Sequence, residues 1–209
     1  MGEIVPIRQM DEREDTAAPV TLGDRAMDNL AFIRETMERS VSFTAVPGYG
    51  GMMMGVTAVA AAVIASRQGY VRNALFVWGC EAALGLMIGL FAMWQKSKIA
   101  DESLTSAPAR KFAMSFLPPL VVGVVIVLGL WQNDVWDLMA PICMLCYGAA
   151  VVCGGAFSVR VVPVMGWCFI VLGVVAFVLP PTYSDLMMAL SFGVLHIIFG
   201  AVIAKRYGG

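Results

Sequence analysis

Apolar runs long enough to cross a bilayer recur six times in this chain and constrain its fold more than any other feature. A transmembrane α-helix needs about 20 predominantly apolar residues, and a helix satisfies its own backbone hydrogen bonds where water is absent. Only 14% of the residues are charged, against about 25% in a typical soluble domain. We therefore predict an all-α polytopic membrane protein, a bundle of six transmembrane helices at residues 47–66, 73–95, 112–131, 137–157, 163–180 and 186–204.

The segment before these runs is rich in Asp, Glu and Arg. Residues 1–20 lack apolar periodicity and are predicted to be disordered. Residues 21–46 are predicted to form an amphipathic interfacial helix in front of the transmembrane domain at 47–209. One face carries apolar side chains (Leu30, Ile33, Met37 and Val41), and the other carries ion pairs at i,i+4 spacing (Arg34 with Glu38, Glu35 with Arg39). The apolar face favours a helix on the membrane surface, and the charged face leaves open a docking helix for a protein partner.

Lysine and arginine residues are distributed unevenly between the two sides that six spans define. With the N-terminus inside, the inner segments near the spans hold nine of them, while the outer loops hold only Arg67 and Arg72. Cytoplasmic loops carry an excess of Lys and Arg, so we predict that both termini are cytoplasmic. The net charge of −1 gives no indication of nucleic-acid binding. The bilayer and, through residues 21–46, a protein are the predicted partners.

Glu81 is a carboxylic acid inside the second apolar run. Gly85 and Gly89 follow at i+4 and i+8, so the three residues share one helix face. Glycine stripes allow transmembrane helices to approach closely, and we expect this face to point into the bundle. An ionisable residue in a membrane is a candidate functional site. Glu81 is either a proton or cation site or a neutral carboxyl that hydrogen-bonds between helices.

His196 is the only histidine and lies in the sixth run between Gly193 and Gly200. It is expected to face inward, either as a neutral hydrogen-bonded side chain or as part of a polar site with Glu81. Counted from the outer ends of their runs at 1.5 Å per residue, the two residues lie at depths of about 12 and 15 Å. We therefore predict a shared interior, and direct contact if the two helices are neighbours.

Glycines in the first run provide a second small-residue face, since Gly51 and Gly55 are four residues apart. Only a short loop joins the first run to the second, which carries Gly85 and Gly89. We predict an antiparallel hairpin in which these small-residue faces pack together.

Two groups of sulfur-containing residues suggest further chemistry. Cys143 and Cys146 have the spacing of a redox pair, but the outer loops lack the second cysteine pair of membrane thiol oxidoreductases, and buried cysteines ordinarily pack as small hydrophobes. Thioether and thiol groups also ligate copper, although adaptable packing is the ordinary role of methionine; the residues concerned are Met139, Cys143, Met144 and Met187. The sequence shows no nucleophile–base pair, so we predict no catalytic residue, no metal and no cofactor.

Three segments resemble an uncharacterised group of small bacterial six-span integral membrane proteins. They are DNLAFIRETMERSVSFTAVPGYG, YGAAVVCGGAFSVRVVPVMG and FGVLHIIFGAVIAKRYGG. The resemblance implies a bacterial inner membrane location and no particular activity.

These features together predict a non-enzymatic integral membrane protein that acts through partners, as a sensor, scaffold or regulatory subunit. The alternative is a small transporter or channel for a proton, cation or small solute that uses Glu81 and His196.

Overall fold

The computed structural model describes residues 43–44, 46–99 and 103–208, together with Gly23, Arg25, Met27, Asn29, Leu30 and Ile33. The chain divides into two units, 1–40 and 41–209, each described by itself. In the first unit the six described residues are helical and exposed. The charged residues predicted to form the other face (Arg34, Glu35, Glu38 and Arg39), with Met37 and Val41, lie outside the described residues, as does the segment 1–20.

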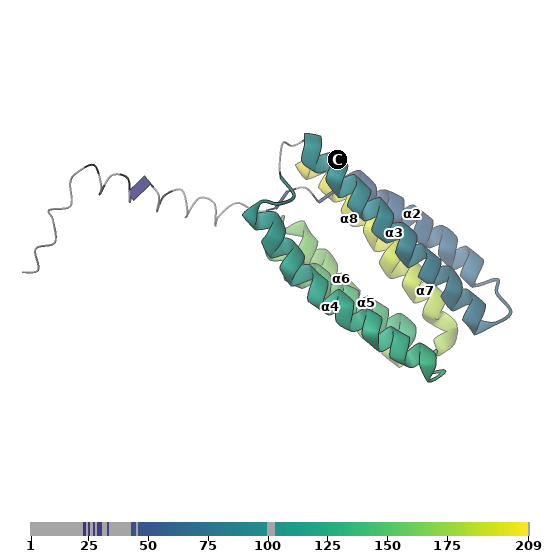
Figure 1. Ribbon diagram of the computed structural model, residues 1–209. Coiled ribbons are helices and arrows are strands. Elements are labelled where there is room, and N and C mark those ends of the chain that lie inside the picture. The colour runs from purple at the N-terminus through teal and green to yellow at the C-terminus, as the bar shows by residue number, and fades with distance from the viewer. Residues whose placement is uncertain are drawn as a thin grey trace, which may run out of the picture. The chain divides into compact units, whose positions relative to one another are not determined.

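The second unit is helical, which confirms the predicted fold class (Figure 1). Its long helices are α2 (Gly48–Ala65), α3 (Val71–Ile99), α4 (Ala107–Gln132), α5 (Met139–Gly155) and α6 (Val161–Val178). The last run is helical throughout, as η1 (Pro181–Tyr183), α7 (Ser184–Met188), the π-helix η2 (Ala189–Leu195) and α8 (His196–Tyr207). Within the described residues, five helical stretches are long and apolar enough to cross a membrane, and α5 is a shorter apolar helix.

Helix α4 begins earlier than the predicted run at 112. The Ser106 side chain accepts a hydrogen bond from the Ala109 backbone N–H at 3.3 Å, and a proline occupies the first turn, where its missing N–H costs nothing. Pro118 and Pro119 therefore lie inside the helix and do not mark its start.

The helices form two groups of three (Figure 1). Helices α4, α5 and α6 follow one another in the chain and pack together, whereas α2 packs against α3 and against the C-terminal helix. Glycines make the close approach between α2 and the C-terminal helix: a Cβ atom on Gly51 would lie 3.4 Å from the Gly200 Cα, and one on Gly55 only 2.6 Å from the Gly193 carbonyl oxygen. The predicted hairpin of α2 and α3 is present, but these two glycines face the last helix instead of α3.

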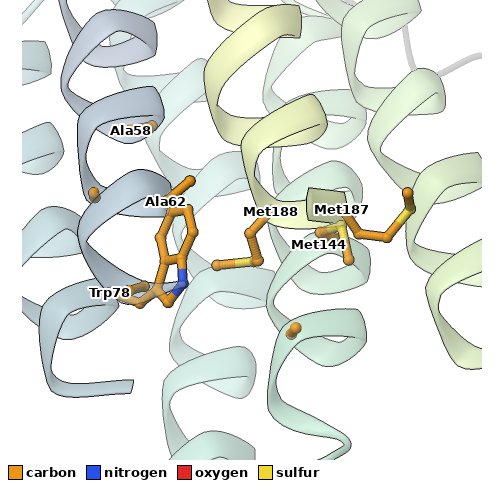
Figure 2. Packing of buried hydrophobic residues seen from close by; sticks show 9 residues of the cluster. Ala58, Ala62, Trp78, Met144, Met187 and Met188 are labelled. Atoms are coloured by element: carbon orange, nitrogen blue, oxygen red, sulfur yellow. The ribbon is translucent and has the colours of Figure 1, made fainter. Parts of the chain in front are cut away.

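An apolar cluster joins the two groups (Figure 2). It combines small residues of α2 with Trp78 of α3, Met144 of α5, and Met187 and Met188 of α7. The side chain of Met188 reaches toward the Trp78 indole, whose Nε1–H donates to the Asp185 carboxylate at 2.8 Å. The long methionine side chains fill the space left beside the alanines of α2, as expected of adaptable core residues.

The segment before α2 is attached to both groups at the end of the bundle where the lysines and arginines gather. The Phe43 backbone N–H donates to the Phe157 carbonyl at 2.8 Å, and the Ser158 hydroxyl donates to the Phe43 carbonyl at 2.7 Å. Phe43 is 1% exposed and its ring lies 5.1 Å from that of Phe112. Phe43 and Thr44 are not helical, so the amphipathic helix does not extend to residue 46 as predicted.

Lys96 lies at the same end and is 8% exposed. Its ammonium group donates to the Val46 carbonyl at 2.9 Å, to the Tyr207 carbonyl at 3.2 Å and to the Gly208 carbonyl at 2.6 Å. Cations stabilise helix C-termini, where backbone carbonyls lack helical partners. Lys96 of α3 therefore binds both the C-terminal end of α8 and the segment that leads into α2.

Candidate functional site

A hydrogen bond between two polar side chains lies inside the bundle, between the two groups of helices. The Tyr147 hydroxyl of α5 and the His196 Nε2 of α8 are 2.8 Å apart, and His196 is 5% exposed. An interhelical polar contact of this kind stabilises helix association in a membrane by about 0.6–2 kcal/mol. The prediction that His196 faces inward and is hydrogen-bonded agrees with this geometry.

Aromatic rings enclose the pair. The rings of Phe169 and Phe192 lie 5.4 Å and 6.1 Å from the imidazole, and Phe192 is nearly parallel to it at an interplanar angle of 14°. Phe169 is fully buried and contacts Tyr147 as well, with ring centroids 4.8 Å apart. Such contacts favour offset and edge-on geometries. They hold the imidazole in a single orientation.

A π-helix ends directly before His196. Residues Ala189–Leu195 are wound more widely than an α-helix, and π-helical turns are frequently found at functional sites. The His196 Nδ1 atom is buried without a well-formed hydrogen bond among the described residues. The backbone of Ser191 and Phe192, one wide turn earlier, is close enough to interact with the ring.

Glu81 lies elsewhere, in a groove between α2 and α3. Its Oε1 atom is 2.8 Å from the Thr57 hydroxyl, which is itself 2.9 Å from the Met54 carbonyl oxygen. The hollow beside it has a volume of about 280 Å³ and is lined by α2 and α3 alone, at Thr57, Ala60, Ala61, Ile64, Val77, Cys80, Glu81 and Leu84.

The structure does not bring Glu81 and His196 together, contrary to the predicted shared interior and contact. The last helix at His196 and Ile197 packs against Gly51 and Gly55 of α2, whereas Glu81 bonds Thr57, two residues beyond Gly55. At about 100° per residue, Thr57 lies about 120° from Gly51 and about 160° from Gly55 around α2. Helix α2 therefore separates the two polar groups.

The predicted packing glycines have different outcomes. Gly51, Gly55, Gly193 and Gly200 make the contact between α2 and the C-terminal helix. Gly89 packs against the Met54 thioether, since a Cβ there would lie 3.4 Å from the sulfur. A Cβ on Gly85 would meet only the Glu81 Oε1, at 4.0 Å, so Gly85 is not a close packing contact.

The sulfur groups lie in packed surroundings. Cys143 and Cys146 are free thiols, and Cys146 fills the space above Gly123 of α4. Met139, Met144 and Met187 are buried, and the last two belong to the apolar cluster of Figure 2. Within the described part of the chain, no group of three or more His, Cys, Asp or Glu side chains is arranged to hold a metal ion.

Two residues of this interior were not singled out from the sequence. Tyr147 is a phenol in the middle of an apolar run, which is a usable signal because a buried hydroxyl needs a partner. Lys96 follows the apolar run directly and resembles any lysine at a membrane boundary. Nothing in its local sequence indicates that it is buried against three carbonyl groups.

No protein-family model, curated protein or solved structure matches the chain. The resemblance to small bacterial six-span membrane proteins therefore stays an expectation.

Proposed function

We propose that the chain is a non-enzymatic integral membrane protein that acts through partners, as a sensor, scaffold or regulatory subunit. The observation that carries this proposal is the attachment of Phe43. The segment that follows the charged N-terminal region is bonded to the loop between α5 and α6 and packs on α4. Three residues later, the Val46 carbonyl accepts a hydrogen bond from Lys96 of α3. A protein bound before Phe43 would therefore act on both groups of helices.

The separation of Glu81 from His196 supports this proposal over ion passage. Each side chain is hydrogen-bonded locally, and α2 stands between them. A polar route through a membrane protein needs polar groups that face a common path. Glu81 and His196 face no common path among the described residues, because they contact different faces of α2.

The gathering of basic residues supports the proposed orientation. Seven lysines and arginines of the transmembrane domain lie at the Phe43 end (Lys96, Lys98, Arg110, Lys111, Arg160, Lys205 and Arg206). By the positive-inside rule this end faces the cytoplasm of a bacterial inner membrane, with both termini on that side.

Co-purification from native membranes in mild detergent tests the proposal. The intact chain, tagged after Gly209, is compared with an Arg34→Glu, Arg39→Glu variant that reverses two charges in the N-terminal segment. An Arg110→Glu variant is the matched control, because Arg110 is an exposed basic residue near Phe43. A protein retained by the intact chain and the control but lost with the double variant is expected.

A small transporter for a proton, cation or solute is the second candidate, favoured by the π-helix next to a buried histidine. Flux into liposomes containing the purified chain, abolished by Glu81→Gln or His196→Phe, would establish it and overturn the first proposal.

A further inference from the structure

Helix α3 lies at the edge of the bundle. Of its 29 residues, only Trp78, Lys96 and Ser97 are buried, and its extensive packing within the described residues is with α2. The groove that holds Glu81 is lined by these two helices alone, so it opens to the outside of the bundle at membrane depth.

Glu81 has hydrogen-bonding capacity that its own chain does not use. Among the described residues its one hydrogen bond is with Thr57. The Thr57 hydroxyl donates this bond to Oε1. A neutral Glu81 then carries its own proton on the second carboxyl oxygen, and within the described residues this proton has no acceptor. Lipid tails offer no acceptor, and an unsatisfied polar group in hydrocarbon costs several kcal/mol.

The rest of the groove allows another helix to approach. Ala60, Ala61 and Thr57 on α2 and Cys80 on α3 are small, and the larger apolar residues of the lining are Ile64, Val77 and Leu84. Small residues beside a polar side chain are the usual composition of contacts between transmembrane helices. The exposed face of α4 is different, because it carries large side chains such as Met114, Leu117 and Val121.

We propose that a second copy of this chain covers the groove, so that the α2–α3 grooves of two copies face each other across a two-fold axis along the membrane normal. Contacts across such an axis are between identical surfaces, which must therefore be self-complementary. Two neutral Glu81 side chains at the same depth satisfy one another, because each donates from its second oxygen to the Oε1 atom of the other, which has a second lone pair besides the one that accepts from Thr57. An acyl chain in the groove would leave the carboxyl proton without an acceptor. The dimer is independent of the proposed partner of the N-terminal segment, because its surface lies wholly on α2 and α3.

Cross-linking locates the contact. Cys80 lines the groove and Cys153 is exposed on α5, so two variants that each retain only one of these cysteines form a matched pair. With the purified chain in liposomes, a short thiol-specific cross-linker is expected to join two copies through Cys80 and not through Cys153. Equal cross-linking of both variants, or none through Cys80, would overturn the proposal. Adducts of Cys80 with a different protein in native membranes, without a homodimer in liposomes, would identify another occupant and overturn it too.

Single-molecule photobleaching in liposomes at graded protein-to-lipid ratios tests the role of the carboxyl group. Glu81→Gln keeps a self-complementary donor and acceptor and should dimerise, whereas Glu81→Leu should weaken dimerisation about tenfold, the effect of losing an interhelical hydrogen bond. Ala60→Leu fills the groove without removing Glu81 and should also weaken dimerisation. Ala201→Leu, at an exposed position of α8, is the control. Monomers at every ratio, or dimerisation unaffected by both Glu81→Leu and Ala60→Leu, would refute the dimer.

Discussion

Replacing glycine by alanine is expected to have opposite effects on stability at two positions. Gly55 lies in the contact between α2 and the C-terminal helix, and Gly129 of α4 lies outside it. An alanine Cβ at position 55 would lie 2.6 Å from the Gly193 carbonyl oxygen and 2.8 Å from the Ile197 backbone nitrogen. These are backbone atoms, so the clash is relieved only if the helices move apart. At Gly129 of α4 a Cβ would meet nothing within 4 Å.

The magnitudes follow from this geometry. Overpacking costs about 1–3 kcal/mol, and a gap of 0.5–1 Å loses about a quarter to a half of each dispersion contact along the interface. Replacing glycine by alanine inside a helix stabilises the folded state by about 0.5–1 kcal/mol. Gly55→Ala should therefore lower the free energy of unfolding by about 1–2 kcal/mol, while Gly129→Ala should raise it by up to about 1 kcal/mol.

Unfolding by dodecyl sulfate in mixed micelles, followed by circular dichroism, measures both effects. Gly193→Ala gives an intermediate case, because its Cβ would meet the Val59 Cγ2 atom at 2.7 Å, and a side chain yields more easily than backbone. If Gly55→Ala and Gly129→Ala change stability by the same amount, the close approach of α2 to the last helix is wrong.

Three further outcomes are expected. Tyr147→Phe removes the hydrogen bond to His196 and should cost about 1–2 kcal/mol in the same titration; a cycle with His196→Phe that shows additive losses would contradict the pairing. Lys96→Met keeps the apolar stem but leaves three carbonyls without their donor, so stability should fall by about 1–3 kcal/mol and proteolysis near the C-terminus should increase; unchanged proteolysis would argue against the contact. A reporter enzyme fused after Gly209 that is active only in the periplasm should give no signal, because the basic segments favour a cytoplasmic C-terminus.

The fold class followed from the sequence because each apolar run is long and its length is set by the bilayer. It was harder to predict which helices pack against each other. Gly51 and Gly55 were correctly expected to lie at a close helix contact, but a small-residue face does not specify which helix it meets. The short loop pointed to α3, whereas the closest backbone approach is to Gly193 and Gly200, far along the chain.

The predicted grouping of Glu81 with His196 also depended on which helices are neighbours. Depth along a helix can be counted from its end, but direction around the bundle depends on which helices are neighbours. Glu81 and His196 were therefore expected to share an interior, and the structure places α2 between them. The π-helix before His196 was not predictable, because one wider turn leaves the apolar pattern of the run unchanged.

The long sequence separation between α2 and α8 has a consequence for synthesis in the cell. Helices α4, α5 and α6 meet neighbours made immediately before or after them, but the Gly51–Gly55 face of α2 waits for a helix that ends about 140 residues later. At a translation rate of about 5–20 residues per second, this delay is roughly 7–30 s. During that time the glycine face and the Lys96 ammonium group lack the C-terminal helix they later contact, so the nascent chain needs lipid or the insertion machinery to shield them. A chain that terminates before α8 would never acquire the C-terminal helix. Quality-control proteases should recognise this truncated chain by the uncovered glycine face of α2.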